Sequence, residues 1–200
     1  MNKDIIQDNT HDITHDLYNL NNSTFGFWLY LMSDGILFAT MFAVYCVMSI
    51  NVVSYKNIFN LSIVFLETLL LLLSSISCGI LVLSVKYKKL ILVYVSLFVT
   101  FLCGVCFVTL EVYEFLNLIQ VGYLPQRNGF LSAFFSLISL HGIHVIFGLC
   151  WMLGLSFHIH KLYFNNIFYI RIVCFSLFWH FLDIIWICIF TIIYLMGNIL

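Results

Sequence analysis

The chain has 200 residues, of which 63% are hydrophobic and 8% are charged, and its net charge is −1. A soluble protein of this composition could not cover its surface with polar atoms, so an ordinary soluble globule is excluded. The nearly neutral chain lacks the basic surface that nucleic acid requires, and nucleic acid is not expected as a partner. The composition predicts a polytopic membrane protein.

Five apolar stretches are long enough to cross a membrane, because a helical span needs about 20 apolar residues to cross about 30 Å of hydrocarbon. Inside a bilayer only helices or closed barrels satisfy the backbone, and stretches of this length favour helices. The predicted fold class is therefore all-α: a five-helix membrane domain at 25–197 that follows a polar tail at 1–24. The spans are expected at 26–50, 61–85, 90–116, 130–157 and 172–196.

The basic residues indicate how the bundle crosses the membrane. Six of the eight lie on the side of the N-terminus, whereas Lys56 and Arg127 lie on the other side. Because basic residues concentrate in cytoplasmic loops, we expect a cytoplasmic tail and N-terminus and an outer C-terminus. Aromatic residues near the span ends, among them Trp28, Tyr30 and Tyr194, are expected to form an interfacial belt.

Seven cysteines fall within the apolar stretches, as small buried hydrophobic residues do, and do not suggest a disulfide framework. Cys103 and Cys106 form a C-x-x-C pair inside a span. Phe107, not histidine, follows the pair, which favours packing over haem attachment or redox chemistry. The polar start of the chain lacks the basic region and short apolar run of a signal peptide, so no cleavable signal is expected.

Eight ionisable residues lie inside the predicted spans, where an isolated charge is costly and a partner is expected. Six of them form i, i+3 pairs, and each pair faces one direction on its helix. At about 1.5 Å per residue, Asp34, His180 and Asp183 are expected in the cytoplasmic half, and the glutamates toward the outer end. The residues of this network are Asp34, Glu67, Glu111, Glu114, His141, His144, His180 and Asp183.

Three interpretations of this network remain open on the residues alone. Acids on the first three spans and histidines on the last two would hold the bundle together by interhelical pairing. A di-iron site is less favoured, because such bundles use Glu-x-x-His pairs and this chain has none in its spans. A haem could be ligated by His144 and His180 on facing helices. Three intramembrane histidines are too few for a haem–copper centre, so we expect no metal site in this chain.

Asp34 is the candidate for proton handling. It lies in the first span beside Met32, Ser33 and Gly35. Burial favours the protonated form of a carboxyl group, which would let Asp34 exchange protons. The alternative is a carboxylate that stays ionised because it is paired with His180 or Lys86.

These motifs resemble, in order, those of subunit III of the haem–copper terminal oxidases. The resemblance covers about residues 25–197, and Glu111-Val112-Tyr113-Glu114 is similar to that family's acidic motif. The mitochondrial form has seven spans, so five spans look like the short bacterial version, as in cytochrome bo-type ubiquinol oxidases. The other motifs are Phe27-Trp28-Leu29-Tyr30-Leu31-Met32-Ser33-Asp34, Phe130-Leu131-Ser132-Ala133-Phe134-Phe135, His141-Gly142-Ile143-His144-Val145-Ile146-Phe147-Gly148 and Trp179-His180-Phe181-Leu182-Asp183-Ile184-Ile185-Trp186.

The resemblance implies a non-catalytic role in a proton-pumping oxidase of the aerobic respiratory chain, in the bacterial inner membrane. In this family subunit III holds no haem or copper, binds phospholipid between its helices, and packs against the catalytic subunit I, which carries both metals. The membrane carboxylate that matches Asp34 is associated with sustaining proton delivery. The seven other network residues are then expected to hold the bundle together. The remaining alternatives are subunit III of a cytochrome c oxidase, an independent proton- or metal-coupled transporter, and a haem-binding membrane protein.

Overall fold

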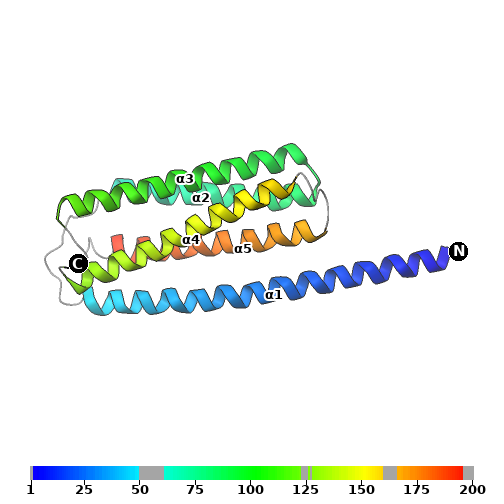
Figure 1. Ribbon diagram of the computed structural model, residues 1–200, viewed down its shortest axis with the longest axis horizontal. Helices are drawn as coiled ribbons and strands as arrows, with labels where there is room; N and C mark the ends of the chain where they lie inside the picture. The colour runs from blue at the N-terminus through cyan, green and yellow to red at the C-terminus, as the bar shows by residue number, and fades with distance from the viewer. Residues whose placement is uncertain (1, 50–60, 123–125, 127, 160–165, 196–200) are drawn as a thin grey trace.

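A computed structural model describes the backbone of residues 2–49, 61–122, 126, 128–159 and 166–195, and the side chains within 24–49, 62–122, 126, 128–157 and 168–195. These segments form five long helices and a short π-helix (Figure 1). Five stretches are long and apolar enough to cross a membrane, which confirms the predicted all-α fold class. The elements are α1 (Asn2–Ser49), α2 (Leu61–Lys86), α3 (Leu90–Gln120), α4 (Gly129–Ile159), α5 (Asn166–Ile189) and η1 (Phe190–Leu195).

Each helix runs past at least one end of its predicted span. α3 continues to Gln120 where 116 was expected, and α5 begins at Asn166 where 172 was expected. A helix can run past the hydrocarbon, because polar residues at its ends are solvated while its backbone remains hydrogen-bonded. α1 begins at Asn2, so the backbone of the polar tail is helical and continues into the first span. Residues 2–25 contain neither Gly nor Pro that would interrupt this helix.

The helices lie lengthwise along the long axis of the molecule, and α1 extends beyond the other helices at its N-terminal end (Figure 1). α1 packs on α4 and α5, while α2 packs on α3 and α5; α3 and α4 also pack on each other. The four other helices therefore form an arc around α5. The start of α1 and the end of η1 lie at opposite ends of the bundle, as an odd number of crossings requires.

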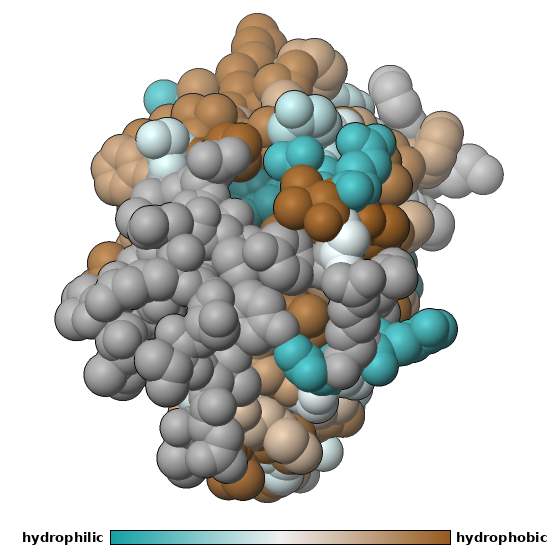
Figure 2. Space-filling view, turned by 90° about the vertical axis from the view of Figure 1, so that its left-hand side faces the viewer, coloured by the Kyte–Doolittle hydropathy of each residue, from teal (hydrophilic) through white to brown (hydrophobic). Residues whose placement is uncertain are grey.

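Much of the outer surface is apolar. Large hydrophobic side chains are exposed on all five helices, and Ile91 of α3 is 81% exposed. On the end of the bundle that Figure 2 presents, hydrophobic side chains surround smaller hydrophilic patches. Exposed apolar surface of this extent suits contact with lipid or with other membrane proteins.

Two tryptophans attach α5 to α2. Trp179 and Trp186 are both 1% exposed and lie seven residues apart, on the same face of the helix. The Trp179 indole Nε1 donates to Ser74 Oγ at 3.0 Å, and Trp186 Nε1 donates to Thr68 Oγ1 at 3.2 Å. Because lipid is as apolar as the helices, packing and such interhelical hydrogen bonds hold a membrane bundle together.

Glycines on two helices make room for the Trp179 ring. A Cβ atom at Gly104 of α3 would lie 3.1 Å from this ring, and one at Gly148 of α4 would lie 3.0 Å from it. These distances are shorter than normal packing allows, so only glycine fits at either position without a shift. Trp179 thus fills a slot formed by α3 and α4, and its indole nitrogen reaches α2 at Ser74. One side chain joins four helices.

The α2–α3 connection is a tight turn. Lys88 adopts the left-handed conformation with φ of 58°. The N–H of Lys89 donates to the Ser84 carbonyl at 3.0 Å and that of Lys88 to the Val85 carbonyl at 3.1 Å, which satisfies two free carbonyls at the end of α2. This turn places the start of α3 directly beside the end of α2.

Candidate functional site

The eight predicted polar residues occur in three separate clusters and one isolated position. One cluster joins α1 to α4, the second joins α2 to α5, and the third joins α2, α3 and η1. They do not assemble into a single site. The clusters are Asp34 with His144, His180 with Asp183, and Glu67 with Glu111 and Glu114, and His141 lies apart from them.

Asp34 of α1 faces His144 of α4. Asp34 Oδ2 lies 3.7 Å from His144 Nε2, and both side chains are 17% exposed. The other ring nitrogen, Nδ1, donates to the Leu140 carbonyl at 2.7 Å, which fixes the orientation of the imidazole. One of the two alternatives drawn from the sequence paired Asp34 with His180 or Lys86, whereas the structure places His144 beside it. α1 packs against α4 at this level, whereas the His180 ring is bonded to α2.

A surface depression of about 440 Å³ lies beside the Asp34–His144 pair. Its walls are aromatic and come from α1 and α4. Tyr30, one turn before Asp34, also interacts with the Asp34 carboxyl group. The depression thus brings the surface of the bundle close to the ion pair. Its lining residues are Phe27, Tyr30, Phe147 and Trp151.

His180 and Asp183 of α5 form the second cluster with Ser75 of α2. The Ser75 Oγ is 2.8 Å from His180 Nδ1, and Asp183 Oδ2 is 3.8 Å from the same nitrogen. The two carboxylate oxygens of Asp183 are buried, and neither has a hydrogen bond to the described residues. The i, i+3 spacing predicted the His–Asp contact. Ser75 was missed, although Ser74 and Ser75 are the polar interruption of a leucine run at 69–73.

The third cluster brings together three carboxyl groups. Glu67 of α2 interacts electrostatically with Glu111 and Glu114 of α3, and it is completely buried. Tyr194 of η1 donates its hydroxyl hydrogen to Glu114 Oε2 at 3.1 Å. The expectation that Tyr194 belongs to an interfacial belt was wrong. It is 1% exposed, because η1 continues α5 and packs against α2.

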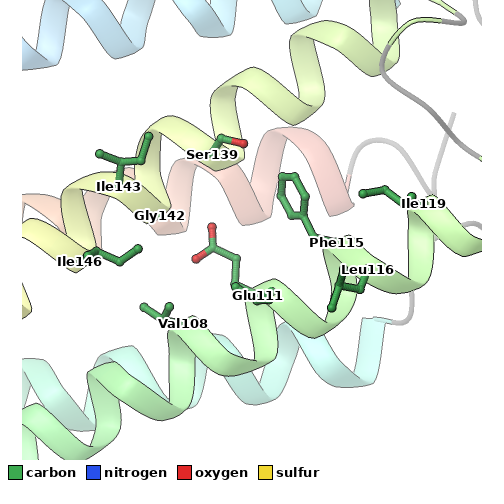
Figure 3. Close-up of a pocket in the computed structure, with 10 residues that line it drawn as sticks. Val108, Glu111, Phe115, Leu116, Ile119, Ser139, Gly142, Ile143 and Ile146 are labelled. Atoms are coloured by element: carbon green, nitrogen blue, oxygen red, sulfur yellow. The ribbon is translucent and has the colours of Figure 1, made fainter.

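Glu111 also borders a groove of about 300 Å³ between α3 and α4. Its carboxyl group points across the groove toward Gly142 (Figure 3). A Cβ atom at Gly142 would lie 2.8 Å from Glu111 Oε1, so glycine leaves the room that the carboxyl group occupies. The rest of the lining is almost entirely apolar. The groove is lined by Val108, Glu111, Val112, Phe115, Leu116, Ile119, Ser139, Gly142, Ile143 and Ile146.

His141 is fully buried among aromatic rings, away from the acids. Its ring centroid is 5.3 Å from that of Trp186, 5.9 Å from Phe107 and 6.5 Å from Phe38. Neither ring nitrogen has a hydrogen-bond partner among the residues that the structure describes. His141 therefore contributes packing between α1, α3, α4 and α5.

The clusters differ in what they can do chemically. The two histidine–carboxylate pairs can hold and exchange a proton, because each joins a proton acceptor to a proton donor. His144 and His180, the two histidines considered as haem ligands, each use Nδ1 in a hydrogen bond, to the Leu140 carbonyl and with Ser75 respectively. In the described segments, no three His, Cys, Asp or Glu side chains are grouped so that they could hold a metal ion.

The fold and the network define a multi-pass α-helical membrane protein, and most ionisable side chains of the network are buried or partly buried between its helices. The family described as cytochrome c oxidase subunit III matches residues 1–198. The cytochrome bo(3) ubiquinol oxidase subunit 3 of Buchnera aphidicola subsp. Acyrthosiphon pisum (strain APS) is 49% identical, over 96% of this chain and 95% of its own length. That of Pseudomonas putida is 50% identical, over 86% and 84%. The cytochrome c oxidase subunit 3 of Bacillus sp. (strain PS3) is 37% identical, over 89% and 87%.

This chain belongs to the cytochrome c oxidase subunit III family, and it is a subunit III of the haem–copper oxidases. The sequence resemblance is thereby confirmed over the whole membrane domain.

Proposed function

We propose that this chain is the non-catalytic subunit III of a proton-pumping ubiquinol oxidase in the bacterial inner membrane. Relatives named cytochrome bo(3) ubiquinol oxidase subunit 3 support this choice of electron donor, with 46–50% identity against 37% for the cytochrome c oxidase subunit. In this proposal, haem and copper reside in the catalytic subunit I, and this chain contributes to assembly and proton delivery.

The observation that carries the proton role is the Asp34–His144 pair. The pair lies one helical turn from a depression whose lining includes Tyr30, and Tyr30 interacts with the Asp34 carboxyl group. His144 Nε2 is the ring nitrogen directed at Asp34, because Nδ1 is used by the Leu140 carbonyl. The pair can therefore store a proton and release it to a neighbouring subunit.

The proposed orientation places this pair on the route of protons that enter from the cytoplasm. Lys86, Lys88 and Lys89 lie at the α2–α3 turn, and Arg171 lies in the first turns of α5, at the same end of the bundle. Basic residues at one end favour a cytoplasmic location for that end. Asp34 lies ten residues from Thr24, or about 15 Å into the span from this side.

In this proposal, the α3–α4 groove binds the phospholipid that the family resemblance implies. Its volume of about 300 Å³ is too small for a helix but suits part of an acyl chain. Its apolar wall extends from Val108 to Ile119, or about 16 Å along α3. One acyl chain lying along α3 would cover this wall.

Asp34→Asn tests the proton role. We expect normal recovery of the assembled oxidase and a normal initial rate of oxygen consumption with ubiquinol, followed by a decline of turnover or pumping within the assay. Asp183→Asn is the matched control, because it removes an acid from α5, away from the depression, and should not change the course of turnover in complexes that do assemble. Immediate loss of assembly in Asp34→Asn would show a structural role instead.

Two further measurements distinguish the proposed function from a cytochrome c oxidase subunit and from an independent transporter. The complex that contains this chain should consume oxygen with ubiquinol and not with reduced cytochrome c; the opposite preference contradicts the choice of donor. The isolated chain in liposomes should transport neither protons nor metal ions. Transport by the isolated chain would favour the independent transporter.

A further inference from the structure

α5 leaves one strip of its surface uncovered, between α1 and α2. Phe181 lies toward α1, where a Cβ atom at Gly35 would be 3.7 Å from its ring. His180 lies toward α2, where its ring is bonded to Ser75. These contacts mark the two edges of an opening whose floor is α5. Four residues of α5 and Thr191 of η1, which continues α5, are exposed or partly exposed here. We name these five residues the α5 strip: Leu177, His180, Ile184, Ile187 and Thr191.

The spacing of the α5 strip is typical of helix-to-helix packing. Its members follow one another at intervals of 3, 4, 3 and 4 residues, which is the heptad pattern of a seam that receives a second helix. Ile184 at the centre of the strip is 61% exposed, and Ile187 is 42% exposed.

Because His180 is polar, we do not expect lipid acyl chains alone to cover the α5 strip. It lies 12 residues from Phe168 and 15 residues from Leu195, or about 18 Å and 22 Å from the two ends of the span. Its side chain is nevertheless 42% exposed. A polar group at this depth faces a protein interior or a partner in the membrane, because acyl chains offer no hydrogen bond.

One ring nitrogen of His180, Nε2, still needs a hydrogen-bond partner. Ser75 and Asp183 both lie on the Nδ1 side of the His180 ring and hold its orientation. Nε2 makes no hydrogen bond to any residue in the described parts of the chain. The covering partner must therefore bring a hydrogen-bonding group to the middle of the membrane, beside Nε2.

We propose that the α5 strip is the docking surface for a transmembrane helix of another oxidase subunit, which places an oxygen-bearing polar side chain against His180 Nε2. This inference rests on the proposed function, since it requires the oxidase complex as the source of the partner. Ser75 and Asp183 act as positioning residues that aim the ring at the partner. The apolar members of the strip supply the helix contact on both sides of this hydrogen bond.

Site-specific photo-crosslinking in the intact complex tests the surface. A benzophenone amino acid at Ile184, one turn from His180, should crosslink to another oxidase subunit. The matched control is Leu102 of α3, which is 49% exposed and also lies 12 residues from the start of its span. It should crosslink to no subunit. Adducts of Ile184 with lipid alone, or no adduct, would overturn the docking surface while leaving the proposed function intact.

Failure of the chain to co-purify with a haem-bearing subunit would contradict both proposals. His180→Leu and His180→Gln then test the hydrogen bond within the complex. His180→Leu should weaken retention of this subunit in detergent by about fivefold, since one interhelical hydrogen bond is lost. His180→Gln, which keeps a polar group, should restore most of the retention. Equal retention of wild type and His180→Leu would show that His180 does not anchor the partner.

Discussion

α5 and α1 are both membrane-spanning helices of this chain, but they are attached in different ways. α5 contacts the four other helices, and its two tryptophans are buried and hydrogen-bonded to α2. α1 lies at the edge of the bundle on α4 and α5, and its Trp28 is 46% exposed. Each helix carries one acid paired with a histidine, Asp183 on α5 and Asp34 on α1.

The two helices show that an aspartate–histidine pair can lie in different surroundings within one bundle. On α5, the acid is 6% exposed and is enclosed by packing that fixes the helix in place. On α1, Asp34 and its partner His144 are each 17% exposed, and most side chains of the helix around Asp34 are exposed or partly exposed. Stability is therefore expected to depend mainly on α5, whereas the proposed proton exchange is assigned to the polar group on α1.

The largest effect is expected for the tryptophans of the two helices. Trp179→Ala should destabilise the isolated subunit by about 3–5 kcal/mol, because it empties the slot beside Gly104 and Gly148 and leaves Ser74 without its donor. Trp28→Ala, the matched change on α1, should cost well under 1 kcal/mol. Thermal unfolding in detergent measures both. Equal losses would contradict the difference between the helices.

Removal of the paired acid should also cost more stability on α5 than on α1, by a smaller margin than for the tryptophans. Asp183→Ala removes a buried partner of His180 and should cost about 1–3 kcal/mol, with a lower yield of assembled complex. Asp34→Ala should cost less, because its carboxyl group and His144 are both partly exposed. The yield of purified complex and the unfolding temperature report the two costs. A greater loss for Asp34→Ala would reverse the assignment of roles.

The smallest change in stability is expected when a glycine that packs against α5 or a glycine of α1 is replaced by alanine. A Cβ at Gly148 would lie 3.0 Å from the Trp179 ring, so Gly148→Ala should destabilise by about 1–2 kcal/mol through overpacking. A Cβ at Gly35 of α1 would lie 3.7 Å from Phe181, an ordinary contact. Gly35→Ala should stabilise α1 by about 0.5 kcal/mol, because alanine loses less entropy in a helix. Destabilisation by Gly35→Ala would show that α1 is packed as tightly as α5.

The membrane fold could be predicted from the sequence, because long apolar stretches in lipid leave the backbone few alternatives to helices. The identity of the buried polar residues could be predicted for the same reason. Their partners could not all be predicted. The alternative in which Asp34 is paired named His180 or Lys86 as the partner, whereas His144 lies beside it, since spacing along one helix does not reveal how neighbouring helices are rotated. The i, i+3 contact of His180 with Asp183 was predictable because it depends on one helix alone.

Hydroxyl residues were the group that sequence reasoning missed. Ser74, Ser75 and Thr68 attract little notice in apolar helices, because their hydroxyls can bond to their own backbone. In the structure all three also meet α5 side chains. Tyr194 was misplaced for a related reason, because its position near a span end suggested an interface rather than a buried donor to Glu114.

The Trp179 slot fixes the height of α5 along the bundle axis. Displacement of α5 by one helical turn, about 5.4 Å, would carry the indole out of the notch between Gly104 and Gly148. The same displacement would break the Ser75–His180 and Glu114–Tyr194 bonds together. One aromatic ring near the middle of the membrane thus sets the axial alignment of polar contacts both at its own level and several turns away.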